Sequence, residues 1–159
     1  MGERPLLLVD IDGVLNVYGV DACPEGFVEY DIFAEDDEPT RLSMEHARWL
    51  RELSTSFDLV WASAWGFEAH ERLGPILQLD RFPFVPMPAI PFPPREKVPA
   101  IAEYVCERAV AWVDDVSMPE AISWAESRAA PTLLVFTDHT RGLERSHVDE
   151  LLRWADELP

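Results

Sequence analysis

Residues 6–16 read LLLVDIDGVLN, so four apolar residues stand directly before the aspartates Asp10 and Asp12. An apolar run of this length is typical of a strand that is buried on both faces of a sheet. A strand in the middle of a sheet cannot house two charges, so we expect both aspartates at its carboxyl end. Open α/β sheets bind their ligands there.

A turn directly after this strand would bring the carboxylates of Asp10 and Asp12 into one small volume, and Gly13 tolerates the backbone angles that such a turn needs. Two like charges held that close repel each other unless a cation lies between them. Hard carboxylate oxygens suit Mg²⁺. A plain polar turn, in which Asp and Gly are common, would give the same residues without any chemistry.

The composition limits the classes of protein to consider. A chain of 159 residues with 48% hydrophobic content is expected to form a single domain over residues 1–159. The net charge of −17 disfavours non-specific binding along a nucleic acid, which depends on clustered basic residues. The two cysteines, Cys23 and Cys106, suggest neither a disulfide framework nor a zinc site, and the first apolar run is too short for a signal peptide or a membrane span. We expect a cytoplasmic protein with no membrane partner, and the sequence indicates no oligomeric state.

Apolar segments of strand length alternate with segments of helical period along the chain. Further strands are predicted at 57–62, 109–113 and 132–136, and helices at 43–54, 67–73, 98–108, 117–125 and from Ser146 onward. The cap residues expected for three of these helices are Ser43, Ser117 and Ser146. This alternation predicts a three-layer Rossmann-like fold, with a parallel sheet and helices on both faces.

Two segments depart from this alternation. Residues 27–33 alternate apolar and polar side chains before an acidic run at 35–38, which suggests a short strand or flap over the first strand's end. A solvated loop with a few anchoring aromatic residues fits equally well. Residues 82–94 read FPFVPMPAIPFPP and exclude a long helix, so we expect an extended cover.

Three further polar positions fall near predicted strand ends. Ser63 follows the second strand, where its hydroxyl would suit a phosphate oxygen or cap the next helix. Lys97 is the one lysine among 13 basic residues, which indicates a need for a compact charge or an accident of an arginine-rich composition. Asp114 and Asp115 end the third strand, and so place two more carboxylates at this edge.

Asp10-x-Asp12-Gly13, Ser63, Lys97 and Asp114-Asp115 resemble, in this order, the four motifs of the haloacid dehalogenase (HAD) superfamily. The resemblance spans residues 5–138. It implies that Asp10 is a nucleophile that forms an aspartyl-phosphate and that Asp12 is the general acid and base. It further implies that Ser63 and Lys97 bind the phosphoryl group. Mg²⁺ would be held by Asp10, Asp115 with help from Asp114, and the backbone carbonyl of Asp12.

The resemblance therefore implies a Mg²⁺-dependent phosphomonoester hydrolase. The segments at 16–40 and 65–95 are too short for a separate cap domain, so an open site is expected. Such a site would admit a bulky phosphate such as a nucleotide or a polynucleotide end. Tyr18, Phe27, Tyr30, Trp65 and Phe67 lie near enough to the motifs to line it.

The sequence leaves two alternatives open. One is a catalytically silent binding or regulatory module that has kept the fold. The other is a phosphorylatable receiver domain, which uses similar residues in a different order. The order in this chain disfavours the receiver domain, because Lys97 precedes Asp114 and Asp115.

Overall fold

The computed structural model describes residues 2–159, and a parallel sheet of four strands forms its centre. The strands are β1 (Leu6–Val9), β4 (Asp58–Trp61), β5 (Val110–Asp114) and β6 (Thr132–Phe136), in the order β4-β1-β5-β6. Strand β1 pairs with β4 on one side and β5 on the other, and all four of its residues are buried. The predicted central strand and parallel sheet are therefore confirmed.

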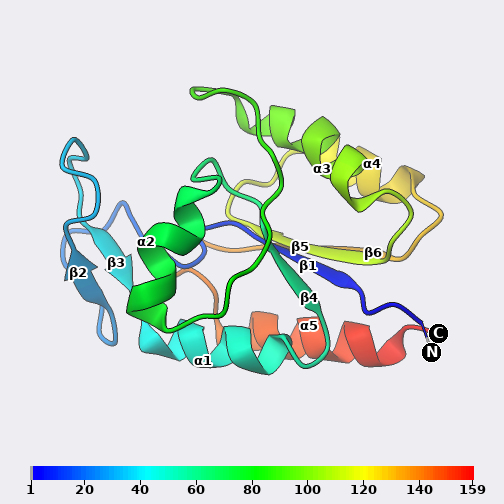
Figure 1. Ribbon diagram of the computed structural model, residues 1–159, viewed down its shortest axis with the longest axis horizontal. Coiled ribbons are helices and arrows are strands. Elements are labelled where there is room, and N and C mark those ends of the chain that lie inside the picture. The colour runs from blue at the N-terminus through cyan, green and yellow to red at the C-terminus, as the bar shows by residue number, and fades with distance from the viewer. Residues whose placement is uncertain (1) are drawn as a thin grey trace.

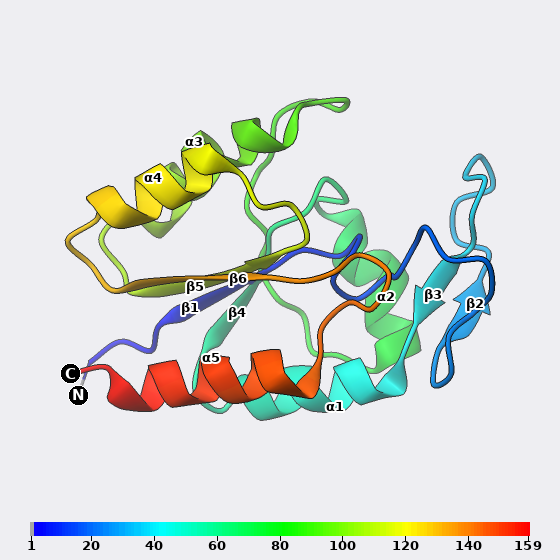
Figure 2. The same cartoon turned by 180° about the vertical axis from the view of Figure 1, so that it is seen from behind.

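Helices cover both faces of this sheet (Figure 1). Helices α1 (Met44–Leu53) and α5 (Arg145–Glu157) lie on one face, and α3 (Lys97–Val105) and α4 (Pro119–Ser127) lie on the other, as the opposite view also shows (Figure 2). The side chains of β1 alternate between two cores: Leu7 and Val9 enter the core under α1 and α5, and Leu6 and Leu8 enter the core under α3 and α4. The three-layer prediction is thus confirmed.

A small hairpin stands beyond the carboxyl ends of the parallel strands (Figure 1). Its strands β2 (Val28–Tyr30) and β3 (Thr40–Leu42) pair antiparallel, and residues 31–39, which we call the hairpin loop, connect them. This hairpin is the predicted flap, although β3 carries no clear strand signal in the sequence. No separate cap domain is present in the described chain, as expected.

The proline-rich segment, residues 82–94, packs against the edge of the sheet. The Trp61 amide donates to the Pro83 carbonyl at 2.9 Å, and the Val85 amide donates to the Trp61 carbonyl at 2.8 Å. Val85 is fully buried. The segment then enters a short 3₁₀ turn, η1 (Pro94–Glu96), which leads directly into α3. The expected extended cover is thus observed.

Helix α2 (Glu68–Leu77) corrects the prediction that this helix ends at Gly74-Pro75. Pro75 lies inside the helix, where it removes one backbone donor. Leu73 and Leu77 are both buried in the core shared with α1, and their burial favours continuing the helix past the proline. The helix ends instead at Gln78, which adopts the left-handed conformation.

Two predicted helix caps are also wrong. Helix α4 begins after Met118, not Ser117, because a residue that precedes proline is kept out of the helical region and Met118 is extended. Helix α5 is capped by Glu144 rather than Ser146, since the side chains of Glu144 and His147 form a reciprocal capping box. The Ser43 cap of α1 is confirmed by its bond to the Glu45 amide.

Two further observations concern membrane-spanning helices and cysteines. Within residues 2–159 no helix has the length and apolar character needed to cross a membrane. Cys23 and Cys106 are both free thiols.

Leu73 offers a direct test of the core that α2 closes. Its side chain is fully buried, so Leu73→Ala should lower the free energy of unfolding by about 2–5 kcal/mol through lost burial and a residual cavity. Urea unfolding followed by circular dichroism measures this loss. Ile122→Ala, at a helix position that is 39% exposed, is the control and should cost about 1 kcal/mol or less. Equal losses for the two variants would contradict the packing described for α2.

Candidate active site

The six residues singled out in the sequence all lie at the carboxyl edge of the sheet. Asp10 directly follows β1, Asp114 is the last residue of β5, and Asp115 follows it. Ser63 lies two residues beyond β4, and Lys97 is the first residue of α3. Parallel strands bring the aspartates and Ser63 together because their carboxyl ends share one edge of the sheet, and Lys97 reaches the same edge from the start of α3.

Lys97 is the centre of the charged contacts. Its Nζ atom lies 2.8 Å from Asp114 Oδ2 and 3.3 Å from Asp10 Oδ2, and it lies 3.4 Å from the Ala62 carbonyl oxygen. The three charged side chains are buried. Asp10 Oδ1 also accepts a hydrogen bond from the Ile11 amide at 2.8 Å. The lysine therefore ties the end of β1 to the end of β5.

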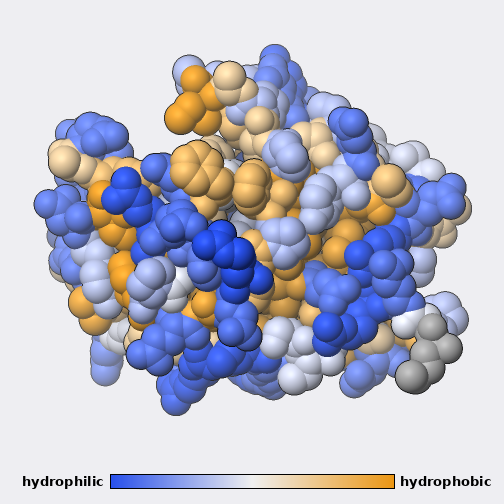
Figure 3. Space-filling view, viewed as in Figure 1, coloured by the Kyte–Doolittle hydropathy of each residue, from blue (hydrophilic) through white to orange (hydrophobic). Residues whose placement is uncertain are grey.

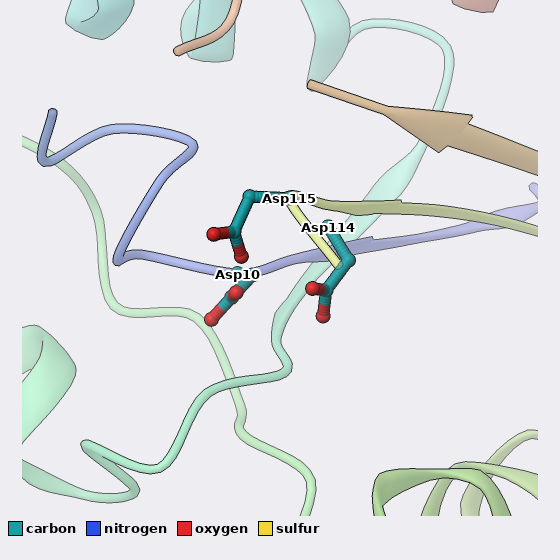
Figure 4. A group of neighbouring side chains, drawn as sticks. All are labelled: Asp10, Asp114 and Asp115. Carbon is teal, nitrogen blue, oxygen red and sulfur yellow. The ribbon is translucent and has the colours of Figure 1, made fainter. Parts of the chain in front are cut away.

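Three carboxylates form a group that could hold a metal ion. One oxygen from each of Asp10, Asp114 and Asp115 lies within 4.8 Å of the others. Figure 4 shows Asp10 reaching this group from the end of β1, and Asp114 and Asp115 reaching it from β5. Both oxygens of Asp114 are already engaged, since Oδ1 accepts from the Val116 amide at 2.9 Å and Oδ2 faces Lys97. Asp115 is therefore the more available ligand of the pair.

The ionisation of these groups follows from burial and mutual charge. Burial raises the pKa of the Asp10 carboxyl well above its usual range; Lys97 opposes this shift, and Asp114 adds to it. Burial alone would lower the pKa of Lys97, yet the charges of Asp10 and Asp114 raise it, so the ammonium form is retained. Burial also raises the pKa of Asp115, while a hydrogen bond from Tyr18 opposes that shift. The carboxylates crowd a site that holds a single ammonium group.

Asp12 lies apart from this group of three. Its side chain is exposed, and it accepts hydrogen bonds from Asn16 Nδ2 at 2.8 Å and from Trp65 Nε1 at 3.1 Å. Its carboxylate is thus turned toward the open side of the site rather than toward the buried carboxylates. That Asp12 offers its backbone carbonyl to a metal stays a prediction.

Ser63 does not cap the next helix, because the N-cap position of α2 is Phe67. Ser63 is 3% exposed, and its hydroxyl oxygen accepts a hydrogen bond from the Trp65 amide at 3.2 Å, as a residue that caps a turn would do. It also lines the same cavity as Asp10 and Lys97. The hydroxyl hydrogen is therefore free to point toward a ligand in that cavity. That Ser63 binds a phosphate oxygen stays a prediction.

Tyr18 contributes a contact that the sequence does not reveal. Its hydroxyl donates to Asp115 Oδ2 at 2.8 Å, and its ring stacks on His139 with the centroids 4.7 Å apart. Burial and the bond to Asp115 raise the pKa of Tyr18, so the hydroxyl remains a donor. The sequence suggests Tyr18 as a lining residue, but its partner lies 97 positions away in the chain.

These residues open into a cavity of about 570 Å³. The hairpin loop forms one wall, with Asp36, Asp37 and Glu38, and the proline-rich segment forms the other, with residues 90–92 and Pro94. The space-filling view shows the surface hollowed between these two segments (Figure 3). One wall is therefore strongly acidic, while the other is largely apolar.

The other aromatic residues suggested for the site are distributed differently. Trp65 contacts Asp12 and so borders the site. Phe27 and Tyr30 line a second cavity, beside α1 and the start of α5. Phe67 is 67% exposed and does not line the first cavity. Only Tyr18 and Trp65, of the five, lie at the candidate site.

Comparison with known proteins identifies the family of the chain. A search of the curated proteins finds no match to the chain. The family model described as the HAD domain in Swiss Army Knife RNA repair proteins matches residues 6–148, which contain all six of the site residues predicted from the sequence. Membership of this family supports a hydrolase of the phosphatase type. The chain therefore belongs to the HAD superfamily, as a HAD domain of the kind described in Swiss Army Knife RNA repair proteins.

Proposed function

We propose that the protein is a Mg²⁺-dependent phosphomonoester hydrolase that acts through an aspartyl-phosphate on Asp10. The observation that carries this proposal is the position of Lys97, whose ammonium group lies 3.3 Å from Asp10 on the cavity wall. Phosphoryl transfer needs positioning and positive charge around the transferred group more than it needs covalent chemistry from the protein. Lys97 supplies part of that charge beside the nucleophile.

The donor set fits Mg²⁺ as the source of the remaining charge. Asp10, Asp12, Asp114 and Asp115 oppose one lysine, so the site without a further cation would repel a phosphate dianion. We propose that Asp10 and Asp115 hold the ion, together with the backbone carbonyl of Asp12, while Asp114 mainly anchors Lys97. When bound, Mg²⁺ would neutralise charge on the phosphate and on these carboxylates.

Gly13 supports this assignment through the space that it leaves. Its φ is +82°, a conformation that favours glycine, and a Cβ atom at this position would meet the Asp115 carboxyl carbon at 2.3 Å. The Asp115 side chain therefore packs directly over the backbone that follows Asp10. A larger residue at this position would displace a proposed metal ligand.

The proposed reaction proceeds in two transfers. A carboxylate oxygen of Asp10 attacks phosphorus, the bond from phosphorus to the ester oxygen breaks, and Asp12 gives that oxygen its proton so that an alcohol leaves. Water then attacks the phosphorus of the aspartyl-phosphate, and Asp12 takes a proton from the water. Inorganic phosphate is released and both carboxyl groups return to their starting states. Ser63 and Lys97 bind the phosphoryl oxygens through both transfers.

The open cavity and the family description suggest the class of substrate. We propose a bulky phosphomonoester, with a nucleotide or the phosphorylated end of an RNA to be tested first. The acidic wall at Asp36, Asp37 and Glu38 and the net charge of −17 oppose contact with a long polyanion, so only the terminal nucleotides are expected to touch the protein. We also propose a cytoplasmic location, in keeping with the two free cysteines, where such substrates are available.

Asp10→Asn tests the proposed nucleophile. The substitution keeps the shape of the side chain but removes the attacking carboxylate, so phosphate release from an aryl phosphate in the presence of Mg²⁺ should fall by about a thousandfold or more. Asp21→Asn, at an exposed position outside the cavity, is the matched control and should leave the rate unchanged. A wild-type protein that stays inert to a broad panel of phosphates with Mg²⁺ present would exclude the proposed function.

Gly13→Ala tests the packing of Asp115 at the metal site. We expect it to abolish most of the Mg²⁺-dependent rise in melting temperature, because the new methyl group displaces the Asp115 carboxylate. Gly26→Ala is a close control, since Gly26 has a φ of +85° but open space where its Cβ would lie. Both variants should lose about 1–2 kcal/mol from the left-handed backbone conformation. An undiminished response to Mg²⁺ in Gly13→Ala would contradict the assignment of Asp115.

The acidic wall leads to an expectation about substrate length. For RNA fragments that end in a monoester phosphate, kcat/KM should not rise as the fragment lengthens from two to about ten nucleotides, because added phosphates gain no basic partners. Steady-state assays of phosphate release on such a series measure this. A tenfold or larger increase with length would show that the protein binds the chain of the substrate and would contradict the proposed role of the wall.

A further inference from the structure

The carboxylate of Asp12 is held by two side chains to which the proposed reaction assigns no part. Asn16 Nδ2 donates to Asp12 Oδ1 at 2.8 Å, and Trp65 Nε1 donates to Asp12 Oδ2 at 3.1 Å. Each oxygen thus receives one hydrogen bond, which fixes both the position and the plane of an otherwise exposed carboxyl group. Each oxygen also keeps a second lone pair for another partner.

Both donors are themselves held in place. The side-chain oxygen of Asn16 accepts from the Arg41 amide of β3 at 2.8 Å, which determines which way its amide group faces. The Trp65 ring packs edge-to-face on Phe33 of the hairpin loop, with the centroids 4.8 Å apart, and the Trp65 amide donates to Ser63 Oγ. The hairpin therefore supports Asp12 through two independent contacts, one polar and one aromatic.

An acid that protonates a leaving oxygen must lie within hydrogen-bond reach of it in the transition state. A short carboxylic side chain at an exposed position would otherwise spread over several rotamers, only some of which point into the cavity. The two hydrogen bonds reduce this spread. Their geometry suits a group that is oriented before the substrate arrives.

We propose that Trp65 and Asn16 are positioning residues that hold Asp12 for proton transfer, and that the β2–β3 hairpin orients the acid through them. This inference rests on the proposed function. Neither residue transfers a proton itself; each acts through Asp12. The hairpin is then part of the catalytic apparatus as well as one wall of the cavity.

The dependence of kcat/KM on the leaving group distinguishes the positioning role from a merely structural one, which would not change that dependence. The value of kcat/KM reports the transfer of phosphate to Asp10, in which an alkyl alkoxide needs a proton from Asp12 but a nitrophenolate does not. Trp65→Phe removes the indole donor and keeps an aromatic ring against Phe33. We expect kcat/KM for an alkyl phosphate to fall on the order of tenfold or more, and that for 4-nitrophenyl phosphate to fall less than about threefold.

Two further variants complete the test. Asn16→Asp keeps an acceptor for the Arg41 amide but replaces the donor to Asp12 with a second carboxylate. Its added charge in the cavity should lower kcat/KM for both substrates, and the lost donor should lower it further for the alkyl phosphate. Trp124→Phe is the control: it removes an indole donor on α4, where the ring packs on Trp112 and Arg128. It should change kcat/KM for neither of the two substrates. Thermal unfolding of each variant checks that the fold is intact.

The possible outcomes separate this inference from the proposed function. A steeper dependence of kcat/KM on the pKa of the leaving group in both site variants supports the positioning role. An equal loss for both substrates, or no loss, with an active wild type overturns the positioning role and leaves the phosphatase in place. A wild type without activity on either substrate overturns the proposed function and, with it, this inference.

Discussion

The contact of one buried ammonium group with two buried carboxylates is the constraint on which the site depends. Lys97 Nζ lies between Asp10 and Asp114, and these three side chains are almost fully enclosed. Burying a charge without a partner costs several kcal/mol, so each of the three requires the others. Lysine suits this position because its compact charge approaches two carboxylates that lie on different strands, whereas the planar fork of arginine needs more room.

The architecture around this contact delivers each charge from a different element. Strands β1 and β5 are neighbours, so their carboxyl ends place Asp10 beside Asp114 without any special loop geometry. The proline-rich segment runs along the edge of the sheet and leads into the 3₁₀ turn η1. Lys97 follows this turn as the first residue of α3. Gly13 then lets the chain turn under Asp115. The fold thus concentrates negative charge at one edge, and the proposed chemistry uses a metal ion to offset it.

Much of the fold is predictable because its signals are local. The four apolar residues before Asp10 indicate a central strand, and the alternation of strand and helix indicates the parallel sheet. Helix boundaries are less accessible: α2 continues past Pro75 because Leu77 is buried, and that burial exists only in the folded state. The cap at Ser117 fails because Pro119 sets the backbone of Met118, a local effect that the cap pattern conceals.

Some features of the candidate site are also predictable from the sequence, and others are not. Residues at strand ends, such as Asp10 and Asp115, are predictable because topology alone brings strand ends together. Contacts such as Tyr18 with Asp115, or Trp65 with Asp12, join residues that lie 97 and 53 positions apart, and no sequence period links them. The sequence suggests Tyr18 and Trp65 as aromatic neighbours of the site, but their hydrogen-bonded partners require the fold.

In the proposed mechanism the phosphoryl group passes through a covalent bond to Asp10. Borohydride reduces an acyl phosphate to an alcohol and so leaves a permanent mass change on the residue that carried it. The most direct measurement is a peptide map by mass spectrometry after the protein has been mixed with a phosphomonoester and Mg²⁺, quenched and treated with borohydride. The mass change is expected on Asp10, and only when both the substrate and Mg²⁺ are present. Steady turnover without this mass change, or a mass change on another carboxylate such as Asp115, would contradict the mechanism.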